Sequence, residues 1–169
     1  MFINEKLQIE EYSYPLAEQN NPIFQSIISS VKKKNVSSPG CYAHMTEWNF
    51  RSKEIDELVL WITDKAQNDM INPYRELSGY YTVICNDVWG IICNRGDYLK
   101  SHRHDPSQFS FVYYVTSPKD SSPLLFRTSG YEVKPEAGKL VIFNSRLLHE
   151  IPPNNCDGRY SFVGNLFAA

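Results

Sequence analysis

The sequence has no long hydrophobic run, and no stretch approaches the roughly 18 apolar residues of a membrane-spanning helix. Residues 1–6 do not form a basic segment followed by an apolar one, so the sequence does not predict a secretory signal. These two absences predict a cytoplasmic protein with no membrane partner.

An excess of charge of one sign is also missing. The chain has 17 basic and 19 acidic residues and a net charge of −2, which disfavours a protein built mainly to neutralise nucleic-acid phosphates. Cysteine is scarce, and none of the four residues forms a C-x-x-C pair. In a chain without a predicted signal, we expect reduced and mostly buried thiols. The four are Cys41, Cys85, Cys93 and Cys156.

The length of 169 residues predicts a single domain. A hydrophobic content of 42% excludes wholesale disorder, and the sequence contains no repeats. Helical periodicity is confined to the first half, and a period of two dominates the second. We therefore expect one domain over 1–169, with helical support from 1–79 and a β core over 80–169.

Two helices are predicted in the first half. Asn21-Pro22 is typical of an N-cap followed by proline at the first helical position, and Lys32–Lys34 suit the last turn. A second helix is predicted after Ser52, because acidic residues in its first turn favour the helix dipole. Its apolar stripe consists of Ile55, Leu58, Val59, Ile62 and Ala66.

The second half predicts short strands separated by Gly, Pro, Asn and Asp. A parallel α/β sheet is disfavoured, because this half has no helical pattern for the crossover connections. The sequence favours a mainly β fold with N-terminal helices, either a barrel or a jelly roll. The predicted strands are Tyr80–Asn86, Trp89–Asn94, Gln108–Val115, Pro123–Phe126, Lys139–Phe143 and Arg159–Leu166.

Three of the four histidines form a candidate metal site. If residues 98–104 are extended, His102 and His104 project from one face, because side chains repeat every two residues in a strand. His149 follows a later strand and would supply a third ligand. Three ligands on one face leave the other positions open, as in non-haem Fe(II) oxygenases. His44 stands alone and is assigned no role.

The last predicted strand carries a candidate anion site. Arg159 and Ser161 share a face, and an arginine fork binds a carboxylate through two parallel hydrogen bonds. A 2-oxo acid with a second carboxylate would chelate the metal at one end and reach Arg159 at the other. The alternative is that Arg159 forms an ordinary surface salt bridge.

The sequence over residues 86–166 resembles the 2-oxoglutarate/Fe(II)-dependent oxygenase superfamily. Within it, the chain is most similar to a small, poorly characterised bacterial and phage branch akin to prolyl 4-hydroxylase catalytic domains. The stretches that carry the resemblance are Trp89–Tyr98, Ser101–His104, Ser110–Val115, Gly138–Ser145, Leu147–Asn154, Arg159–Phe162 and Asn165.

The resemblance implies a double-stranded β-helix (jelly-roll, cupin-like) core that holds Fe(II). It also implies a hydroxylase that uses O₂ and converts 2-oxoglutarate to succinate while oxidising a prime substrate, either a protein side chain or a small molecule. By the same resemblance, His102 and His149 are metal ligands. Arg159 binds the distal carboxylate of 2-oxoglutarate with Ser161 beside it, and Tyr98 touches this cosubstrate.

The third ligand departs from the common pattern of the superfamily, which has a carboxylate where this chain has His104. An imidazole there makes the site one charge unit more positive and still suits Fe, Ni, Cu or Zn. Asp105 is the other candidate. Strand alternation favours His104, and Asp105 precedes Pro106, a pair typical of a turn.

Two other functions remain open from the sequence. A three-histidine cupin-like metal enzyme would share the fold and the histidines without using 2-oxoglutarate. A jelly roll without catalysis could instead bind a protein or a sugar. In any of these cases, Trp89, Tyr113 and Phe126 are candidates to line a pocket, because aromatic rings commonly do so.

Overall fold

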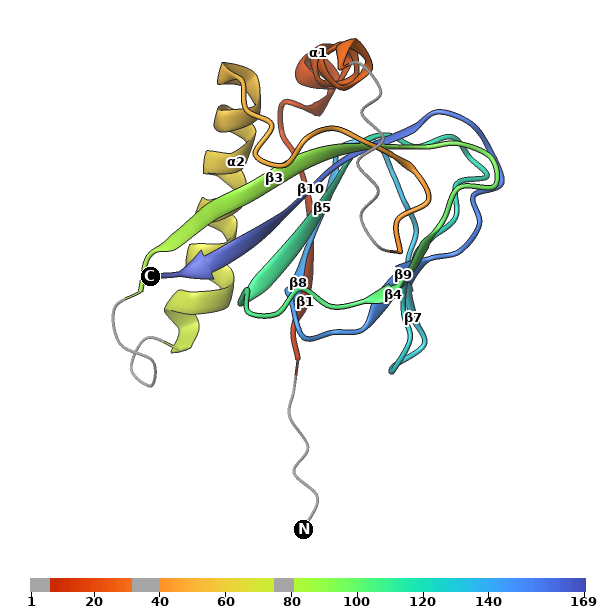
Figure 1. Ribbon diagram of the computed structural model, residues 1–169. Helices are drawn as coiled ribbons and strands as arrows, with labels where there is room; N and C mark the ends of the chain where they lie inside the picture. The colour runs from red at the N-terminus through yellow and green to blue at the C-terminus, as the bar shows by residue number, and fades with distance from the viewer. Residues whose placement is uncertain (1–6, 32–39, 75–80) are drawn as a thin grey trace.

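A computed structural model describes residues 7–31, 40–74 and 81–169 of the chain (Figure 1). Two α-helices, a π-helical segment (η1), a 3-10 turn (η2) and ten strands make up these ranges. In chain order they are β1 (Ile9–Ser13), α1 (Ala17–Ser30), β2 (His44–Met45), α2 (Lys53–Lys65), η1 (Ala66–Ile71), η2 (Asn72–Tyr74), β3 (Val83–Cys93), β4 (Leu99–His102), β5 (Phe109–Thr116), β6 (Leu124–Phe126), β7 (Tyr131–Val133), β8 (Lys139–Asn144), β9 (His149–Ile151) and β10 (Arg159–Ala168).

The strands form two antiparallel sheets. The larger sheet has the order β1-β8-β5-β10-β3-β2, and the smaller has the order β4-β9-β6-β7. From β3 to β10 the chain passes repeatedly between the sheets, because β4, β6, β7 and β9 belong to the smaller one. This winding is that of a jelly roll, and it confirms the predicted mainly β fold with N-terminal helices.

The two helices cover the outer face of the larger sheet (Figure 1). Phe24 and Ile28 of α1 share one buried cluster with Ile55 and Ile62 of α2 and with side chains of β5 and β10. Helix α2 begins where the sequence predicts, because the Oγ of Ser52 accepts a hydrogen bond from the amide of Ile55 at 3.3 Å. The helices therefore pack on the face of the larger sheet that points away from the smaller sheet.

A second core fills the space between the two sheets. Strand β5 contributes to both cores, because Phe111 and Tyr113 face the helices whereas Val112 and Tyr114 face the smaller sheet. Coverage on both faces explains why β5 is an almost continuous apolar run in the sequence. The inner core is the one that borders the histidines.

Helix α1 begins earlier than predicted. It starts at Ala17 and contains Pro22 in its interior, and Leu16 at its N-cap makes no side-chain capping bond. Asn21 lies inside the helix and does not cap it; its Oδ1 accepts a hydrogen bond of 2.6 Å from the hydroxyl of Tyr113. The predicted last turn at 32–34 lies outside the described residues.

The strand boundaries also differ from the prediction. The two strands predicted over 80–94 are one long strand, β3, within the described residues from 81 onward. In the pairing of β3 with β10, Asn86 has no partner, which makes it a β-bulge. The polar residues at this bulge are the ones that the sequence analysis took for the end of a strand. Strands β1, β2, β7 and β9 were not predicted. Because β1 and β2 join the larger sheet, the N-terminal half supplies strands as well as helices.

Within residues 7–31, 40–74 and 81–169, no helix combines the length and apolarity that crossing a membrane requires. The expected cytoplasmic location stays a prediction. All four cysteines are free thiols, but only Cys93 is buried, so the expectation of mostly buried thiols is wrong. Burial raises the pKa of the Cys93 thiol to about 11, which keeps it protonated at neutral pH.

Candidate metal centre

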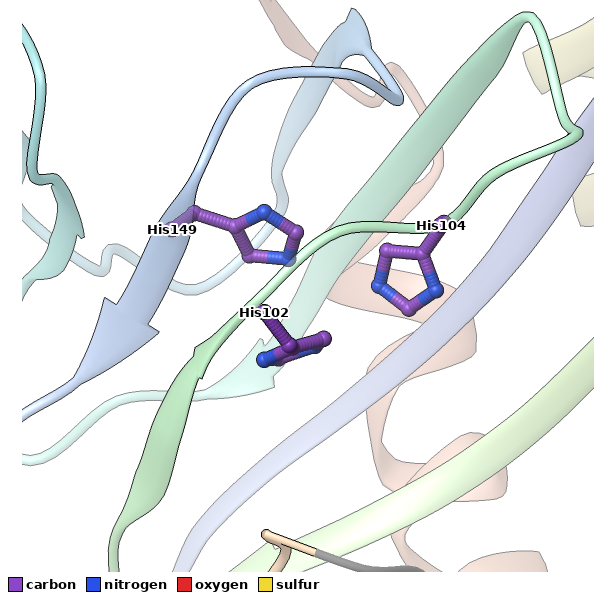
Figure 2. Close-up of side chains that lie close together, drawn as sticks. All are labelled: His102, His104 and His149. Atoms are coloured by element: carbon purple, nitrogen blue, oxygen red, sulfur yellow. The ribbon is translucent and has the colours of Figure 1, made fainter.

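The three predicted histidines lie together between the sheets, and Figure 2 shows their rings turned toward one another. One ring nitrogen from each of His102, His104 and His149 lies within 4.8 Å of the others. His102 ends β4 and His149 begins β9, and the two residues are paired across these antiparallel strands. The pairing of β4 with β9 therefore brings together two side chains that are 47 positions apart in the sequence (149 − 102).

Backbone carbonyls orient two of the three rings. The Nδ1 of His102 lies 2.7 Å from the carbonyl oxygen of Lys100, and the Nδ1 of His149 lies 2.8 Å from that of Leu147. A carbonyl oxygen only accepts, so each Nδ1 carries the proton and donates. The Nε2 lone pair of each ring is then free to bind a metal, the arrangement usual for metal-ligating histidines.

His104 reaches the cluster by a different route. Strand β4 ends at His102, two residues before His104, so strand pairing does not position the third histidine. A backbone hydrogen bond of 3.0 Å from the amide of His104 to the carbonyl of Ser145 instead fixes the segment that follows. Asp105 is exposed and lies outside the cluster. The structure thus places the His104 imidazole with the other two and leaves the Asp105 carboxylate outside.

Burial keeps two of the imidazoles uncharged. It lowers the pKa of His149 to about 3 and that of His104 to about 4, and in both cases the nearby His102 lowers the pKa further. Neutral imidazoles present lone pairs at neutral pH. Three nitrogen donors without a carboxylate suit Fe, Ni, Cu or Zn better than Mg or Ca, so the residues present fit a divalent transition metal.

A cavity of about 260 Å³ adjoins the three histidines. Its wall is mostly apolar and aromatic, and it includes Met45, Trp48, Trp89, Ile91, Val112 and Phe143. Trp89 therefore lines the pocket as predicted. Tyr113 does not, because its ring packs against Phe24 on the helix-covered face of the sheet. Phe126 lies against His149 and Phe143 and is also absent from the cavity wall.

Arg159 lies on the same face of β10 as Val163, which belongs to the core between the sheets, but it is not one of the residues that line the cavity. Its side chain is 1% exposed, one terminal nitrogen (Nη1) donates to the carbonyl of Ser122 at 2.9 Å, and its Cζ lies 5.4 Å from the centre of the Tyr114 ring. The Nε has no hydrogen-bond partner among the described residues. Ser161, two positions on, is also buried. The alternative of a surface salt bridge is therefore wrong.

Tyr114 is a candidate site residue that the sequence analysis missed. Its hydroxyl is buried and has no hydrogen-bond partner within the described part of the chain. Burial raises the pKa of this hydroxyl, so it stays protonated and able to donate. The period of two along β5 could have placed Tyr114 on the inward face with Val112, but its unpaired state becomes visible only in the structure.

Tyr98 lies just before β4, and its ring stacks on that of Tyr42 at 4.4 Å between centroids. It is absent from the cavity wall, and its predicted contact with a cosubstrate stays a prediction. Of the other arginines in the second half, Arg103 lines the cavity, whereas Arg127 and Arg146 lie outside its wall. The guanidinium of Arg127 is paired with Glu150 at 2.8 Å.

No protein-family model and no curated protein sequence matches the chain. Solved structures do match. The viral collagen prolyl hydroxylase of Paramecium bursaria Chlorella virus-1, in complex with 2-oxoglutarate, gives a TM-score of 0.69 at 16% identity over 94% of each chain. A prolyl-4-hydroxylase of Pseudomonas putida gives 0.69 at 16% identity, over 97% of this chain and 94% of that one.

A third similar structure is HygX from Streptomyces hygroscopicus with nickel and 2-oxoglutarate bound. Its TM-score is 0.67 at 14% identity, over 95% of this chain and 83% of that one. At such identities the comparisons show a shared fold. They confirm that the chain has the jelly-roll fold of 2-oxoglutarate/Fe(II) oxygenases, as its sequence resemblance implied.

Proposed function

We propose that the chain is an Fe(II)- and 2-oxoglutarate-dependent oxygenase that acts as a hydroxylase. The observation that carries the proposal is the convergence of His102, His104 and His149 within 4.8 Å, in the fold that the solved oxygenases share. The fold supplies the scaffold, and the three imidazoles supply the donor set.

The three histidines would hold the metal through one nitrogen each and leave its remaining positions open. Bound Fe(II) would supply the redox chemistry that couples O₂ to the oxidative decarboxylation of 2-oxoglutarate and to oxidation of a prime substrate. The chain's own contribution is orientation, since the Lys100 and Leu147 carbonyls fix two of the rings. The mostly apolar cavity wall would limit the access of water to the reacting groups once a substrate covers them.

Arg159, Tyr114 and Ser161 would hold the distal carboxylate of 2-oxoglutarate. Two of their donors, the Nε of Arg159 and the hydroxyl of Tyr114, are buried without an acceptor, and an unpaired buried donor costs free energy. An unpaired buried guanidinium also requires a compensating anion. A dicarboxylic 2-oxo acid satisfies both requirements, because its second carboxylate accepts hydrogen bonds and carries the opposite charge.

The prime substrate is proposed to be a protein side chain or a small molecule. Among similar structures, one is a prolyl hydroxylase of Trichoplax adhaerens in complex with a peptide fragment, and HygX was solved with hygromycin B bound. In this chain, Trp48 lines the cavity and is 45% exposed, so it offers an aromatic contact to a substrate that enters from solvent.

Two linked measurements test the proposal. Mn(II) should raise the unfolding temperature of the metal-free protein, and N-oxalylglycine should raise it further only when Mn(II) is present. With Fe(II) and O₂, the protein should form succinate from 2-oxoglutarate. Equal stabilisation by N-oxalylglycine with and without metal, together with no succinate, would contradict the proposal.

A second candidate is a three-histidine metal enzyme that does not use 2-oxoglutarate. The presence of His104 in place of a carboxylate favours it, because three imidazoles and no carboxylate form the cluster. Buried Arg159 and Ser161 have no evident role in such an enzyme. It predicts stabilisation by metal alone, with no added effect of N-oxalylglycine.

A further inference from the structure

A buried asparagine, Asn154, joins segments that are distant in the sequence. Its side chain is 2% exposed, its Oδ1 accepts from the amide of Ser122 at 2.9 Å, and its Nδ2 donates to the carbonyls of Cys93 and Cys156 at 3.1 and 2.7 Å. Its backbone exchanges two further hydrogen bonds of 2.8 Å with the turn at 96–97. One N–H and two carbonyls surround the amide, so its orientation is fixed.

Ser122 links Asn154 to the proposed cosubstrate site. Its amide is held by Asn154, and its hydroxyl donates to the carbonyl of Pro153 at 2.8 Å. The carbonyl of the same residue accepts the 2.9 Å hydrogen bond from Nη1 of Arg159. Residues 153 and 154 therefore fix the position of the oxygen that the guanidinium meets.

That oxygen is the one hydrogen-bond acceptor of the Arg159 side chain within the described ranges. The guanidinium also lies over the Tyr114 ring, with its Cζ 5.4 Å from the ring centre. A planar fork binds a carboxylate well only when its plane and its free edge are correctly aimed. If the Ser122 carbonyl shifts, the guanidinium loses its single hydrogen-bonded anchor and can rotate away from the carboxylate.

We propose that Asn154 is a positioning residue for the cosubstrate: through Ser122 it aims the Arg159 guanidinium at the distal carboxylate. The inference rests on the proposed function, because it requires a dicarboxylic ligand at Arg159. It predicts a specific signature. Loss of Asn154 weakens binding of a ligand with a distal carboxylate and leaves a ligand without one unaffected.

The test compares 2-oxoglutarate with 2-oxobutyrate, which has the same 2-oxo acid group but no distal carboxylate. Calorimetric titration of the Mn(II)-loaded protein gives the affinity ratio of the two ligands. In Asn154→Ala the preference for 2-oxoglutarate, defined as its association constant divided by that of 2-oxobutyrate, should fall by roughly tenfold. This is the loss expected when one hydrogen bond to a charged group is impaired. The affinities for 2-oxobutyrate and for Mn(II) should match those of the wild type.

Asn94→Ala is the matched control. Asn94 accepts a hydrogen bond from the amide of Gly158 at 3.1 Å, next to Arg159, but makes no contact with Ser122. It should leave the ratio unchanged. If Asn154→Ala does not unfold cooperatively, Asn154→Ser replaces it, and the ratio should still fall.

Three outcomes have distinct meanings. An unchanged ratio in the variants, or equal weakening of both ligands, overturns the inference and reduces Asn154 to a purely structural residue. A fallen ratio with unchanged metal affinity supports it. A wild-type protein that does not prefer 2-oxoglutarate over 2-oxobutyrate contradicts the proposed function itself, and the inference is overturned with it.

Discussion

The two faces of strand β5 hold neighbouring tyrosines in opposite situations. Tyr113 faces the helices, and its hydroxyl donates a 2.6 Å hydrogen bond to Asn21. Tyr114 faces the space between the sheets, and its hydroxyl has no partner among the described residues. A buried donor without an acceptor is unfavourable unless something absent from the polypeptide satisfies it. On strand β5, the polypeptide itself therefore satisfies the tyrosine of the helix-covered face, whereas the tyrosine of the inner face keeps a donor that a ligand would satisfy.

Arg159 and the histidines extend the same contrast. The cluster under the helices is apolar apart from tyrosine hydroxyls, whereas the inner face holds a buried guanidinium and three imidazoles. Such groups add little to the stability of a core unless they are paired. Variants on the inner face should therefore change ligand binding far more than folding.

The largest effect is expected at the histidines. His102→Ala and His149→Ala should each abolish stoichiometric binding of Fe(II) or Mn(II), because each removes one of three donors from the cluster. The unfolding transition of the metal-free protein should remain cooperative. Elemental analysis after gel filtration measures the metal content, with His44→Ala as a control outside the cluster. Unchanged metal in both variants would exclude these ligands.

The next prediction concerns the third metal ligand, for which His104 and Asp105 are the two candidates. His104→Ala should lower metal affinity strongly, while Asp105→Ala should leave it unchanged, because the Asp105 carboxylate lies outside the cluster and is exposed. Competition with a fluorescent chelator measures both affinities. The opposite result would replace the three-histidine centre with two histidines and a carboxylate.

Arg159→Ala should weaken 2-oxoglutarate binding by about 2–4 kcal/mol, the scale for losing a buried hydrogen bond to a charged group and leaving a charge unpaired. This corresponds to roughly 30- to 1,000-fold in affinity, with the metal retained. Arg159→Lys should restore only part of the loss, because an ammonium cannot reproduce the fork. If calorimetry shows unaltered binding in Arg159→Ala, another group holds the carboxylate.

The smallest effect concerns the two tyrosines directly. Tyr113→Phe should lower the free energy of unfolding by about 1 kcal/mol, the usual value of one hydrogen bond, without affecting 2-oxoglutarate. Tyr114→Phe should leave stability unchanged or raise it slightly, because it removes an unpaired donor, and should weaken 2-oxoglutarate binding. Urea unfolding measures the stability of both variants, and calorimetry measures their affinity for 2-oxoglutarate. The same pattern of effects in both tyrosine variants would remove the distinction between the faces.

Local signals allowed part of this structure to be predicted from the sequence. Helix α2 begins after Ser52 as predicted, because its cap and apolar stripe lie within the segment itself. The start of α1 was missed because Asn21 is engaged by Tyr113, a contact between residues 92 positions apart. Strands β1 and β2 were missed because they are short edge strands specified by their partners β8 and β3.

The candidate site also contains some residues that the sequence predicted and others that only the structure reveals. The cluster was predicted from the spacing of His102 and His104 and the position of His149, taken together with Arg159 and with the family resemblance, because histidine spacing alone is a weak signal. The reason that His104 belongs to it was not predictable, since its backbone bond to Ser145 closes a loop beyond β4. Tyr114 and Asn154 were missed because their roles depend on burial and on partners far away in the sequence.

Calorimetric titration of 2-oxoglutarate into the protein with and without Mn(II) tests most directly whether the histidine cluster and Arg159 form one binding site. The account predicts strong binding to the Mn(II)-loaded wild type, and little or none to the metal-free protein or to Mn(II)-loaded Arg159→Ala. Binding of equal strength in all three samples would contradict it.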